Sequence, residues 1–273
     1  METTTQPATP GSASYAPTDR TVPTRSRDRA TYDRAAVHAI LDASYVCHLG
    51  FVRDGAPVVL PTLYARVGER LYVHGSTGSR PLRMAGAAPE GTSSEDATSR
   101  SGSTEDTVSE GGSTEETASE SRPTEDTASG SASDPGLPVC LTVTHVDGLV
   151  LARSAFHHSI NYRSVMVHGI ARQVTDPDEK RAALDALVDH VVPGRSADSR
   201  RANAKELAAT AVLSLDLDEV SAKTRTGGPN DEPEDMDLPY WSGVVPLRKG
   251  YDPLIPSADL APGIEVPDYL TEI

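Results

Sequence analysis

The sequence predicts a mainly β protein with a few peripheral helices and one long acidic insertion. Three observations indicate this class. Apolar runs of strand length alternate with turn-forming residues, helical periodicity is confined to short stretches, and one internal segment has almost no apolar residue. Of the 273 residues 37% are hydrophobic and 21 are proline, so we expect part of the chain to lie outside any packed core.

Composition divides the chain into three parts. Residues 1–28 are rich in Thr, Ser, Pro and Ala without periodicity, which predicts a disordered leader. Residues 29–226 carry the strand and helix patterns of a folded domain, and residues 227–273 form an acidic, proline-rich tail. We expect the tail to wrap back on the domain through its apolar residues, which are Trp241, Val244, Val245 and Leu247.

The elements expected before the insertion are a helix at residues 33–42, strands at 46–52, 58–64 and 70–74, and a helix at 79–85. Val37, Ile40 and Leu41 recur at helical spacing on one face of the first helix. Asp54-Gly55 predicts a tight hairpin turn between the first two strands. Ser79 is a suitable N-cap for the second helix, whose free amides would then face any anion bound nearby.

The insertion spans residues 88–136 and is an acidic repeat. Residues 91–130 form four related decapeptides, and the whole insertion carries 12 acids and 2 arginines, a net charge of −10. Repeats can form a solenoid, but these have almost no apolar residue to stack. Low hydrophobicity with high net charge predicts a disordered surface loop.

The elements expected after the insertion are strands at residues 138–147 and 148–154, an irregular crossing at 156–162, a strand at 163–174, a helix from 176, a helix at 204–209 and a strand at 211–217. A tight turn near Asp147-Gly148 would join the first two strands. Asp176, with Pro177 in the first turn and Glu179 three residues after the cap, predicts a helix start. The apolar residues that would pack this helix on the sheet are Leu184, Leu187, Val188 and Val191.

Charge and composition exclude several classes of partner. The formal net charge of −15 argues against nucleic acid or an anionic membrane, because both need a basic face. No apolar stretch reaches the ~18 residues that span a membrane, and the polar N-terminus has no signal-peptide core. Cys47 and Cys140 lie in apolar runs, which favours small buried thiols over a disulfide or a metal pair. We therefore expect a soluble, cytoplasmic protein.

Two short segments combine the residue types that bind phosphate. Leu71-Tyr-Val-His-Gly-Ser-Thr-Gly-Ser-Arg80 ends a strand in a Gly/Ser loop and an arginine, and Asn161-Tyr-Arg-Ser-Val-Met-Val-His-Gly169 begins another strand. Glycine permits close backbone approach, hydroxyls and amides donate to oxyanions, and arginine adds a planar charged fork. Two such segments on neighbouring strands would clamp a phosphate. The candidate residues are Ser76, Ser79, Arg80, Arg163 and Ser164.

Together with Pro61-Thr-Leu-Tyr64 on the preceding strand, these motifs resemble the pyridoxamine 5′-phosphate oxidase-related family of FMN-binding split β-barrels, and its nitroimidazole-resistance-like, flavin-nucleotide-binding branch in particular. The likeness covers roughly residues 29–87 and 136–226. It implies a split β-barrel with FMN as its cofactor. It also implies a homodimer whose flavin sites lie at the subunit interface.

The resemblance implies roles for five more positions near the flavin. Pro61, Thr62 and Tyr64 would lie along the flavin ring or ribityl chain, largely through backbone groups. His74 and Gly75 would contact the cofactor through the backbone. For Tyr64 the sequence leaves a second interpretation open, a barrel-face aromatic residue without contact to a ligand.

Two further places have both a functional and a plain interpretation. Lys223 occupies the position of a basic residue in the family, where it would contact phosphate or substrate, but a surface lysine explains it as well. His157 and His158 suggest a metal pair, yet adjacent residues of a regular element point in different directions and no third ligand is evident. We expect no metal site.

The resemblance implies an FMN-dependent oxidoreductase that passes electrons from NADH or NADPH to a small acceptor, with a nitroaromatic or quinone-like compound suggested by the branch. The flavin itself carries the redox chemistry, so we assign no catalytic residue. Two alternatives stay open: a flavin carrier or sensor without turnover, and a deazaflavin- or haem-binding barrel. We do not expect pyridoxamine phosphate oxidation itself, because residues 227–273 lack a basic, aromatic substrate clamp.

Overall fold

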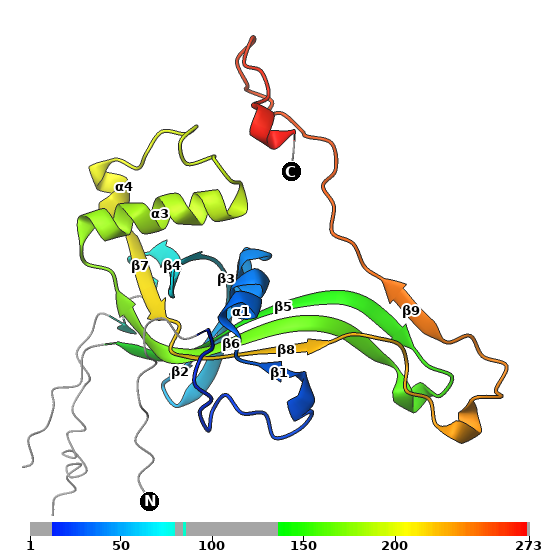
Figure 1. Ribbon diagram of the computed structural model, residues 1–273. Helices are drawn as coiled ribbons and strands as arrows, with labels where there is room; N and C mark the ends of the chain where they lie inside the picture. Colours follow the sequence, from blue (N-terminus) through cyan, green and yellow to red (C-terminus); the bar gives the residue numbers. More distant parts are fainter. Residues whose placement is uncertain (1–12, 80–83, 86–135, 272–273) are drawn as a thin grey trace, which may run out of the picture. The chain divides into compact units, whose positions relative to one another are not determined.

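Figure 1 shows an antiparallel β-barrel with peripheral helices, in a computed structural model that describes residues 13–79, 84–85 and 136–271. The described strands form one sheet in the order β1-β8-β6-β7-β4-β3-β2-β5-β9. A further pairing between β6 and β5 closes the strands from β6 to β5 in that order into a ring. This confirms the mainly β barrel with few helices that the sequence predicts.

The strands are β1 (Ala30–Thr31), β2 (Val46–Arg53), β3 (Ala56–Val67), β4 (Arg70–Ser76), β5 (Leu137–Leu151), β6 (Ser159–Gln173), β7 (Thr210–Asp216), β8 (Glu219–Arg225) and β9 (Gly243–Pro246). The α-helices are α1 (Arg34–Asp42), α3 (Pro177–Val191) and α4 (Ala204–Ala209), and short 3-10 turns lie at η1 (Arg27–Arg29), η2 (Ala155–His157), η3 (Pro233–Asp235) and η4 (Asp268–Leu270). None of the helices in this part of the chain has the length and apolar content to span a bilayer. The predicted helix at 79–85 and the insertion at 88–136 fall almost entirely outside the described residues.

The core lies inside the ring, where alternate residues of the strands meet. In β5, Leu141 and Val143 point inward and are at most 1% exposed, whereas their neighbours along the strand are partly or fully exposed. Helix α1 adds Val37, Ile40 and Leu41 to the same cluster. Burying a side chain of this size contributes about 1.5–3 kcal/mol, so the alternating strands and the apolar face of α1 hold the barrel together.

The turn between β2 and β3 has the geometry that its sequence predicts. Asp54 (φ 51°) and Gly55 (φ 74°) both adopt left-handed conformations, as a two-residue type I′ hairpin turn requires. Arg53 pairs with Ala56 on either side of the turn, and this sets the register of the two strands. That register determines which residues of β3 face the interior.

Each α-helix begins at a side-chain cap. Asp33 accepts a hydrogen bond from the Ala36 amide at 2.8 Å, and Asp176 accepts from the amides of the first turn of α3. Asn203 and Glu206 form a reciprocal capping box at α4. These caps confirm the predicted helix starts.

Glu179 departs from the expected capping pattern of α3. Its carboxylate accepts hydrogen bonds from Arg70 Nη1 and from the Tyr72 hydroxyl, each at 2.9 Å. Both donors belong to β4, so Glu179 attaches α3 to the barrel instead of bonding its own N-cap amide. This contact holds α3 over β4.

The turn predicted near Asp147-Gly148 is wrong. Strand β5 runs through both residues, and the register shifts between Val146 and Gly148, which is a β-bulge. The strand continues because β6 pairs with it on one side and β9 on the other. Gly148 suits this place, since a Cβ there would lie 3.1 Å from Cγ1 of Val244 in β9. For the same reason β6 begins at Ser159 and not at the predicted residue 163.

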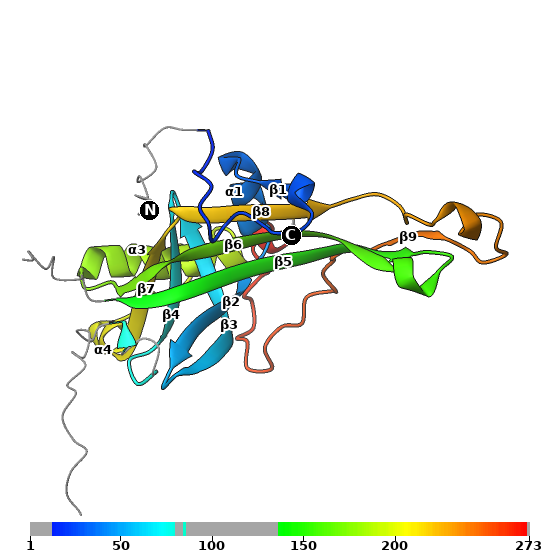
Figure 2. The same cartoon turned by 90° about the horizontal axis from the view of Figure 1, so that it is seen from below.

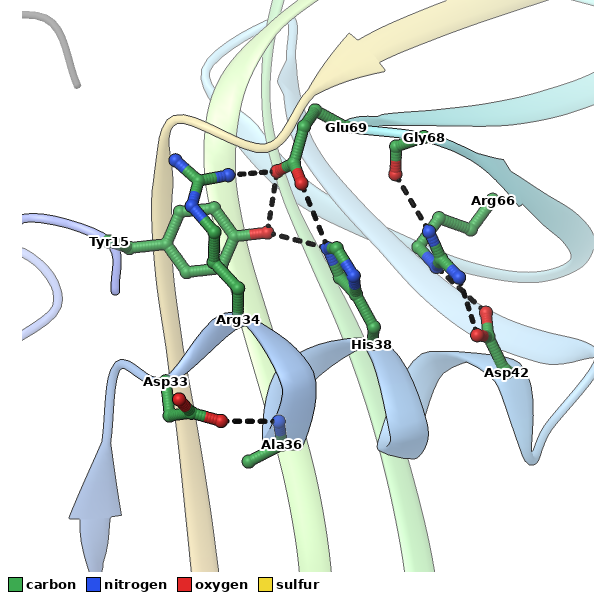
Figure 3. Close-up of polar contacts among 9 residues, drawn as sticks. All are labelled: Tyr15, Asp33, Arg34, Ala36, His38, Asp42, Arg66, Gly68 and Glu69. Atoms are coloured by element: carbon green, nitrogen blue, oxygen red, sulfur yellow. Dashed lines mark hydrogen bonds and ion pairs between the residues drawn. The ribbon is translucent and has the colours of Figure 1, made fainter. Parts of the chain in front are cut away.

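Residues 13–28, which the sequence assigns to the leader, lie against the barrel. Tyr15 is 2% exposed, and its hydroxyl donates to Glu69 Oε2 at 2.8 Å and lies 3.0 Å from Nε2 of His38 (Figure 3). Arg34 stacks over the Tyr15 ring at 4.2 Å and also pairs with Glu69. One buried aromatic residue therefore orders a segment whose composition alone predicts disorder.

The tail returns to the sheet through β9, which pairs with β5 (Figure 2). Figure 2 also shows β5 and β6 continuing side by side to η2. Val244 and Val245 lie in this strand, opposite Val150 and Leu149. Trp241 and Leu247, in contrast, stay 66% and 46% exposed. They do not pack on the barrel of their own chain.

Candidate functional site

A cavity of about 160 Å³ opens between β3 and β4. Its walls contain Pro61 and Thr62 of the β3 motif and His74 and Ser79 of the first phosphate-type motif, whereas no residue of the second motif, 161–169, lines it. The apolar residues that line it are Leu49, Leu60, Val73 and Leu213. Four of the predicted cofactor residues thus meet around one cavity, although they come from separate parts of the sequence.

The backbone of β3 is open at this cavity. Strand β4 pairs with β3 only over Tyr64–Val67, whereas β2 pairs with β3 over Ala56–Leu63. On the β4 side, residues 56–63 therefore have no strand partner in the described part of the chain. Pro61 lies in this open stretch, where its lack of an N–H removes no ladder bond. The open edge leaves backbone groups free to contact a ligand.

The loop after β4 is a tight turn that bonds to the end of α4, the helix directly before β7. The Ser79 amide donates to the Ser76 carbonyl at 2.8 Å, and the Gly78 amide donates to Ser76 Oγ at 3.2 Å. The Thr77 amide donates to the Ala209 carbonyl, where α4 ends. Ser76 is exposed, so its backbone and hydroxyl face solvent. Arg80 lies outside the described residues, and its phosphate role stays a prediction.

His74 lines the cavity from β4. It lies in β4 opposite Val212, and its Nδ1 is buried without a hydrogen-bond partner in the described part of the chain. Burial lowers the pKa of the imidazole, so the ring is neutral near pH 7. Gly75, the next residue, stays in the ladder opposite Ala211.

Tyr64 points away from the cavity. Its side chain is fully buried, its hydroxyl donates to the Leu41 carbonyl, and its ring centroid lies 5.1 Å from that of His190. Burial raises the pKa of the phenol, so the hydroxyl is a donor at all ordinary pH values. Its amide donates to the Tyr45 carbonyl at 3.2 Å. The side chain therefore has the core position that the sequence left as the second interpretation.

The predicted clamp on neighbouring strands is not formed within one chain. Strand β7 separates β4 from β6, so Ser76 and Arg163 do not lie on adjacent strands. Arg163 lies between His145 of β5 and Thr224 of β8, and its guanidinium makes two hydrogen bonds of 2.9 and 2.8 Å to Asp147. This pairing holds the pKa of Asp147 below its usual value. Sequence reasoning failed here because strand order depends on pairings distant in sequence.

Ser164 and Lys223 lie together at the β6–β8 pairing. Ser164 Oγ lies 3.4 Å from the Lys223 carbonyl, and the Lys223 ammonium donates to the Arg25 carbonyl at 3.2 Å. Neither residue lines the small cavity. His157 and His158 occupy the far end of β5 and β6, where His157 faces Glu232 at 3.6 Å and His158 lies 3.1 Å from the Ser154 carbonyl.

A second, larger cavity of about 630 Å³ lies between α3, the segment after it and the edges of β3 and β4. One wall is apolar and is formed by Leu63, Leu184, Leu187, Val188, Val191 and Val192. The other contains the arginines Arg195, Arg200 and Arg201. His74 lines this cavity as well as the smaller one.

The arginines of the large cavity are held by exposed acids. Arg200 makes hydrogen bonds of 2.7 and 3.0 Å to Glu206 and lowers the pKa of that carboxyl to about 2. Arg201 pairs with Asp185 at 3.0 Å, and the Arg201 side chain is 75% exposed. Exposed pairs of this kind contribute little to stability, so these guanidinium groups can exchange an acid for an anionic ligand at small cost. Sequence reasoning missed this cavity, for which the arginines after α3 were the available signal.

Comparison with known proteins identifies relatives over most of the chain. The sequence matches the family model described as pyridoxamine 5′-phosphate oxidase over residues 33–102 and 117–224. The structure of the flavocytochrome Anf3 from Azotobacter vinelandii is 34% identical, with a TM-score of 0.72, and the match covers 94% of this chain and 98% of that one. The FAD and haem binding protein from Mycobacterium smegmatis is 32% identical, with a TM-score of 0.68 and coverage of 89% and 96%.

A more distant structural likeness was also found. A putative 5-nitroimidazole antibiotic resistance protein from Bacteroides thetaiotaomicron is 17% identical, with a TM-score of 0.45, and the match covers 71% of this chain and 85% of that one. No curated protein matches the chain.

Proposed function

The chain belongs to the pyridoxamine 5′-phosphate oxidase family, and on that basis we propose that it binds a flavin nucleotide along the open edge of β3, with the 160 Å³ cavity between β3 and β4 holding part of it. One observation carries the proposal: Pro61, Thr62, His74 and Ser79 come from separate motifs and line the same cavity. The unpaired edge of β3 supplies backbone donors and acceptors, and these suit the polar edge of the flavin ring system, whose faces are apolar.

We assign the phosphate of the flavin to the loop that follows β4. The Ser76–Ser79 turn brings its hydroxyls beside the cavity, while its amides donate within the chain, and Arg80 follows it in sequence. FMN is the cofactor that the sequence motifs imply. FAD carries the same first phosphate, and one of the two relatives above 30% identity binds FAD. Acid extraction of the flavin followed by chromatography distinguishes the two.

We propose that the flavin serves an oxidoreductase reaction between NADH or NADPH and a small acceptor. The flavin supplies hydride and single-electron chemistry, so the protein needs to bind and orient it and to control access. The apolar lining of the cavity supports this role, because it excludes water from one face of the ring. Reduction of the bound flavin by NADH or NADPH, followed by anaerobic addition of nitroaromatic and quinone acceptors, tests turnover. A flavin that no nicotinamide reduces would favour the carrier or sensor alternative.

A homodimer would complete the flavin site. Strands β2, β3, β5 and β6 expose apolar side chains, among them Val46, Val52, Val59, Val146, Met166 and Ile170. Exposed apolar residues on adjoining strands indicate an interface. Since Arg163 does not reach the cavity of its own chain, its predicted phosphate role needs a second copy. Light scattering on the purified protein tests the subunit number.

Haem is the second candidate ligand, and the large cavity favours it. Of the two relatives named above, one is described as a flavocytochrome and the other as a FAD and haem binding protein. The cavity of about 630 Å³ falls within the ~300–1,000 Å³ usual for ligand sites. Its apolar wall suits the macrocycle, and its arginines suit the two propionates. His74 lies in the same wall, and imidazole is a common ligand of haem iron.

An absorption spectrum of the purified full-length protein tests both ligands at once. Flavin gives its two visible bands, and haem gives an intense Soret band. A matched pair of variants then locates the flavin: Thr62→Trp fills the small cavity, whereas Val67→Trp adds the same bulk to an exposed place on β3 that lines neither cavity. We expect Thr62→Trp to lose flavin and Val67→Trp to retain it. Equal flavin content in the two variants would contradict the assigned cavity.

A further inference from the structure

We propose that His74 is the protein ligand of a haem iron bound in the 630 Å³ cavity. This inference rests on the proposed haem binding and adds to it the residue that holds the metal. It also makes His74 the contact between the flavin and haem sites, because this residue lines both cavities.

The first argument is the unsatisfied state of the imidazole. Nδ1 of His74 is buried and has no hydrogen-bond partner in the described part of the chain. Native structures pair nearly all their buried polar atoms, so this unpaired nitrogen sets His74 apart; because Nδ1 itself has no accessible surface, the other ring nitrogen, Nε2, is the one that could reach an iron in the cavity. Imidazole is the side chain most often used to bind haem iron, and one axial nitrogen is sufficient in many haem proteins.

The second argument is the state of three of the other buried or half-buried histidines. His145 contacts the Ile40 carbonyl through Nε2 at 2.9 Å, and His190 contacts the Ser44 carbonyl through Nε2 at 2.6 Å. His38 is engaged by Tyr15 and Glu69 (Figure 3). None of these three lines the large cavity. Their hydrogen bonds explain their burial without any metal.

The third argument is the chemistry around His74. In the described part of the chain no three His, Cys, Asp or Glu residues gather to hold a metal ion by themselves. A haem iron does not need such a group, because the macrocycle supplies four nitrogens and the protein only the axial ligands. The cavity adds an apolar wall from α3 and a wall with three arginines, and these match the two parts of the haem.

Removal of the imidazole tests the ligand. The full-length wild type, His74→Ala and His48→Ala are produced with haem supplied and are compared by Soret absorbance per polypeptide and by electron paramagnetic resonance of the ferric form. His48 is an exposed β2 residue outside both cavities and serves as the matched control. We expect His74→Ala to lose haem affinity by ~10- to 100-fold or more, the scale of perturbing a metal site. His48→Ala should match the wild type.

A second variant covers the case in which the alanine protein does not fold. His74→Met keeps a side chain of similar reach and offers a thioether, which is also an axial haem ligand and raises the reduction potential. We expect it to retain haem with shifted visible bands and a higher potential. A wild-type resonance spectrum, Soret band and potential in both His74 variants would overturn the assignment.

Wild-type protein that takes up flavin but no haem would overturn this inference while leaving the proposed flavin binding intact. Wild-type protein that takes up haem but no flavin, with the His74 effects as expected, would support the ligand and remove the flavin proposal.

Discussion

Replacing Tyr64 by phenylalanine separates the two roles that its place in β3 permits. The hydroxyl is buried and donates to the Leu41 carbonyl near the end of α1. A buried acceptor that loses its donor costs about 1–3 kcal/mol. The Ser44 amide also reaches this carbonyl, at 3.5 Å, so part of the loss is compensated. We therefore expect Tyr64→Phe to lower the free energy of unfolding by about 1–2 kcal/mol.

The same substitution should leave flavin content unchanged, because the phenol points into the core and lines neither cavity. Urea unfolding measures the first effect, as a lower midpoint with an unchanged slope, and flavin absorbance per polypeptide measures the second. Tyr15→Phe is the matched control. Its hydroxyl bonds Glu69, whose side chain is 50% exposed and can be solvated instead, so the loss should be smaller.

Two results would refute this reasoning. An unfolding free energy within about 0.5 kcal/mol of the wild type would mean that the buried hydroxyl makes no significant bond. Loss of flavin from a Tyr64→Phe protein that unfolds at the wild-type urea concentration would mean that the phenol contacts the ligand.

Three further predictions follow from charges and from the insertion. If a second chain brings Arg163 to the phosphate, Arg163→Ala should weaken the binding of FMN by about 1.5–3 kcal/mol and leave the affinity for riboflavin unchanged. Both flavins are titrated into the variant, and equal losses of affinity for the two would show that the assignment is wrong. Arg163 lowers the pKa of Asp147, so their pairing stabilises the fold above the pKa that Asp147 has in the unfolded chain. This contribution is lost as the pH falls through the lower pKa of the folded state. Asp147→Asn should therefore flatten the acid limb of a stability–pH curve, and an unchanged limb would argue against the ion pair. If the insertion is the disordered loop that its composition predicts, deleting residues 89–134 should leave flavin content and melting temperature nearly unchanged, because the closure free energy of such a loop changes by only about 0.6 kcal/mol per halving of its length. Calorimetry on the two proteins checks this.

Local signals predicted much of the barrel. The Asp54-Gly55 turn, the spacing of Val37, Ile40 and Leu41, and the cap at Asp176 each specify a structure within a few residues, and the structure has all three. The turn predicted at Asp147-Gly148 failed for the opposite reason. Whether Asp-Gly makes a turn or a bulge there depends on β9, which lies almost a hundred residues later and pairs along β5.

The candidate site was predictable only where its residues belong to contiguous sequence motifs. The residues of β3 and β4 around the small cavity could be named because their motifs are contiguous. The large cavity could not, because its walls come from β3, β4, α3 and the segment after α3, which no local pattern relates. Tyr64 shows the same limit at a single position. Alternation along β3 cannot tell an inward aromatic residue from one that faces a ligand, because both are surrounded by apolar residues.

The unpaired edge of β3 affects how a single chain without ligand behaves in solution. Residues 56–63 offer a row of free backbone groups with Val59, Leu60 and Leu63 exposed beside them. An open, apolar strand edge is a template for strand addition from another molecule, and natural proteins cover such edges. A ligand against this edge, or a second subunit over it, removes the template. Ligand-free chains should accordingly aggregate by strand addition, and loss of cofactor should shorten their soluble lifetime before it unfolds the barrel.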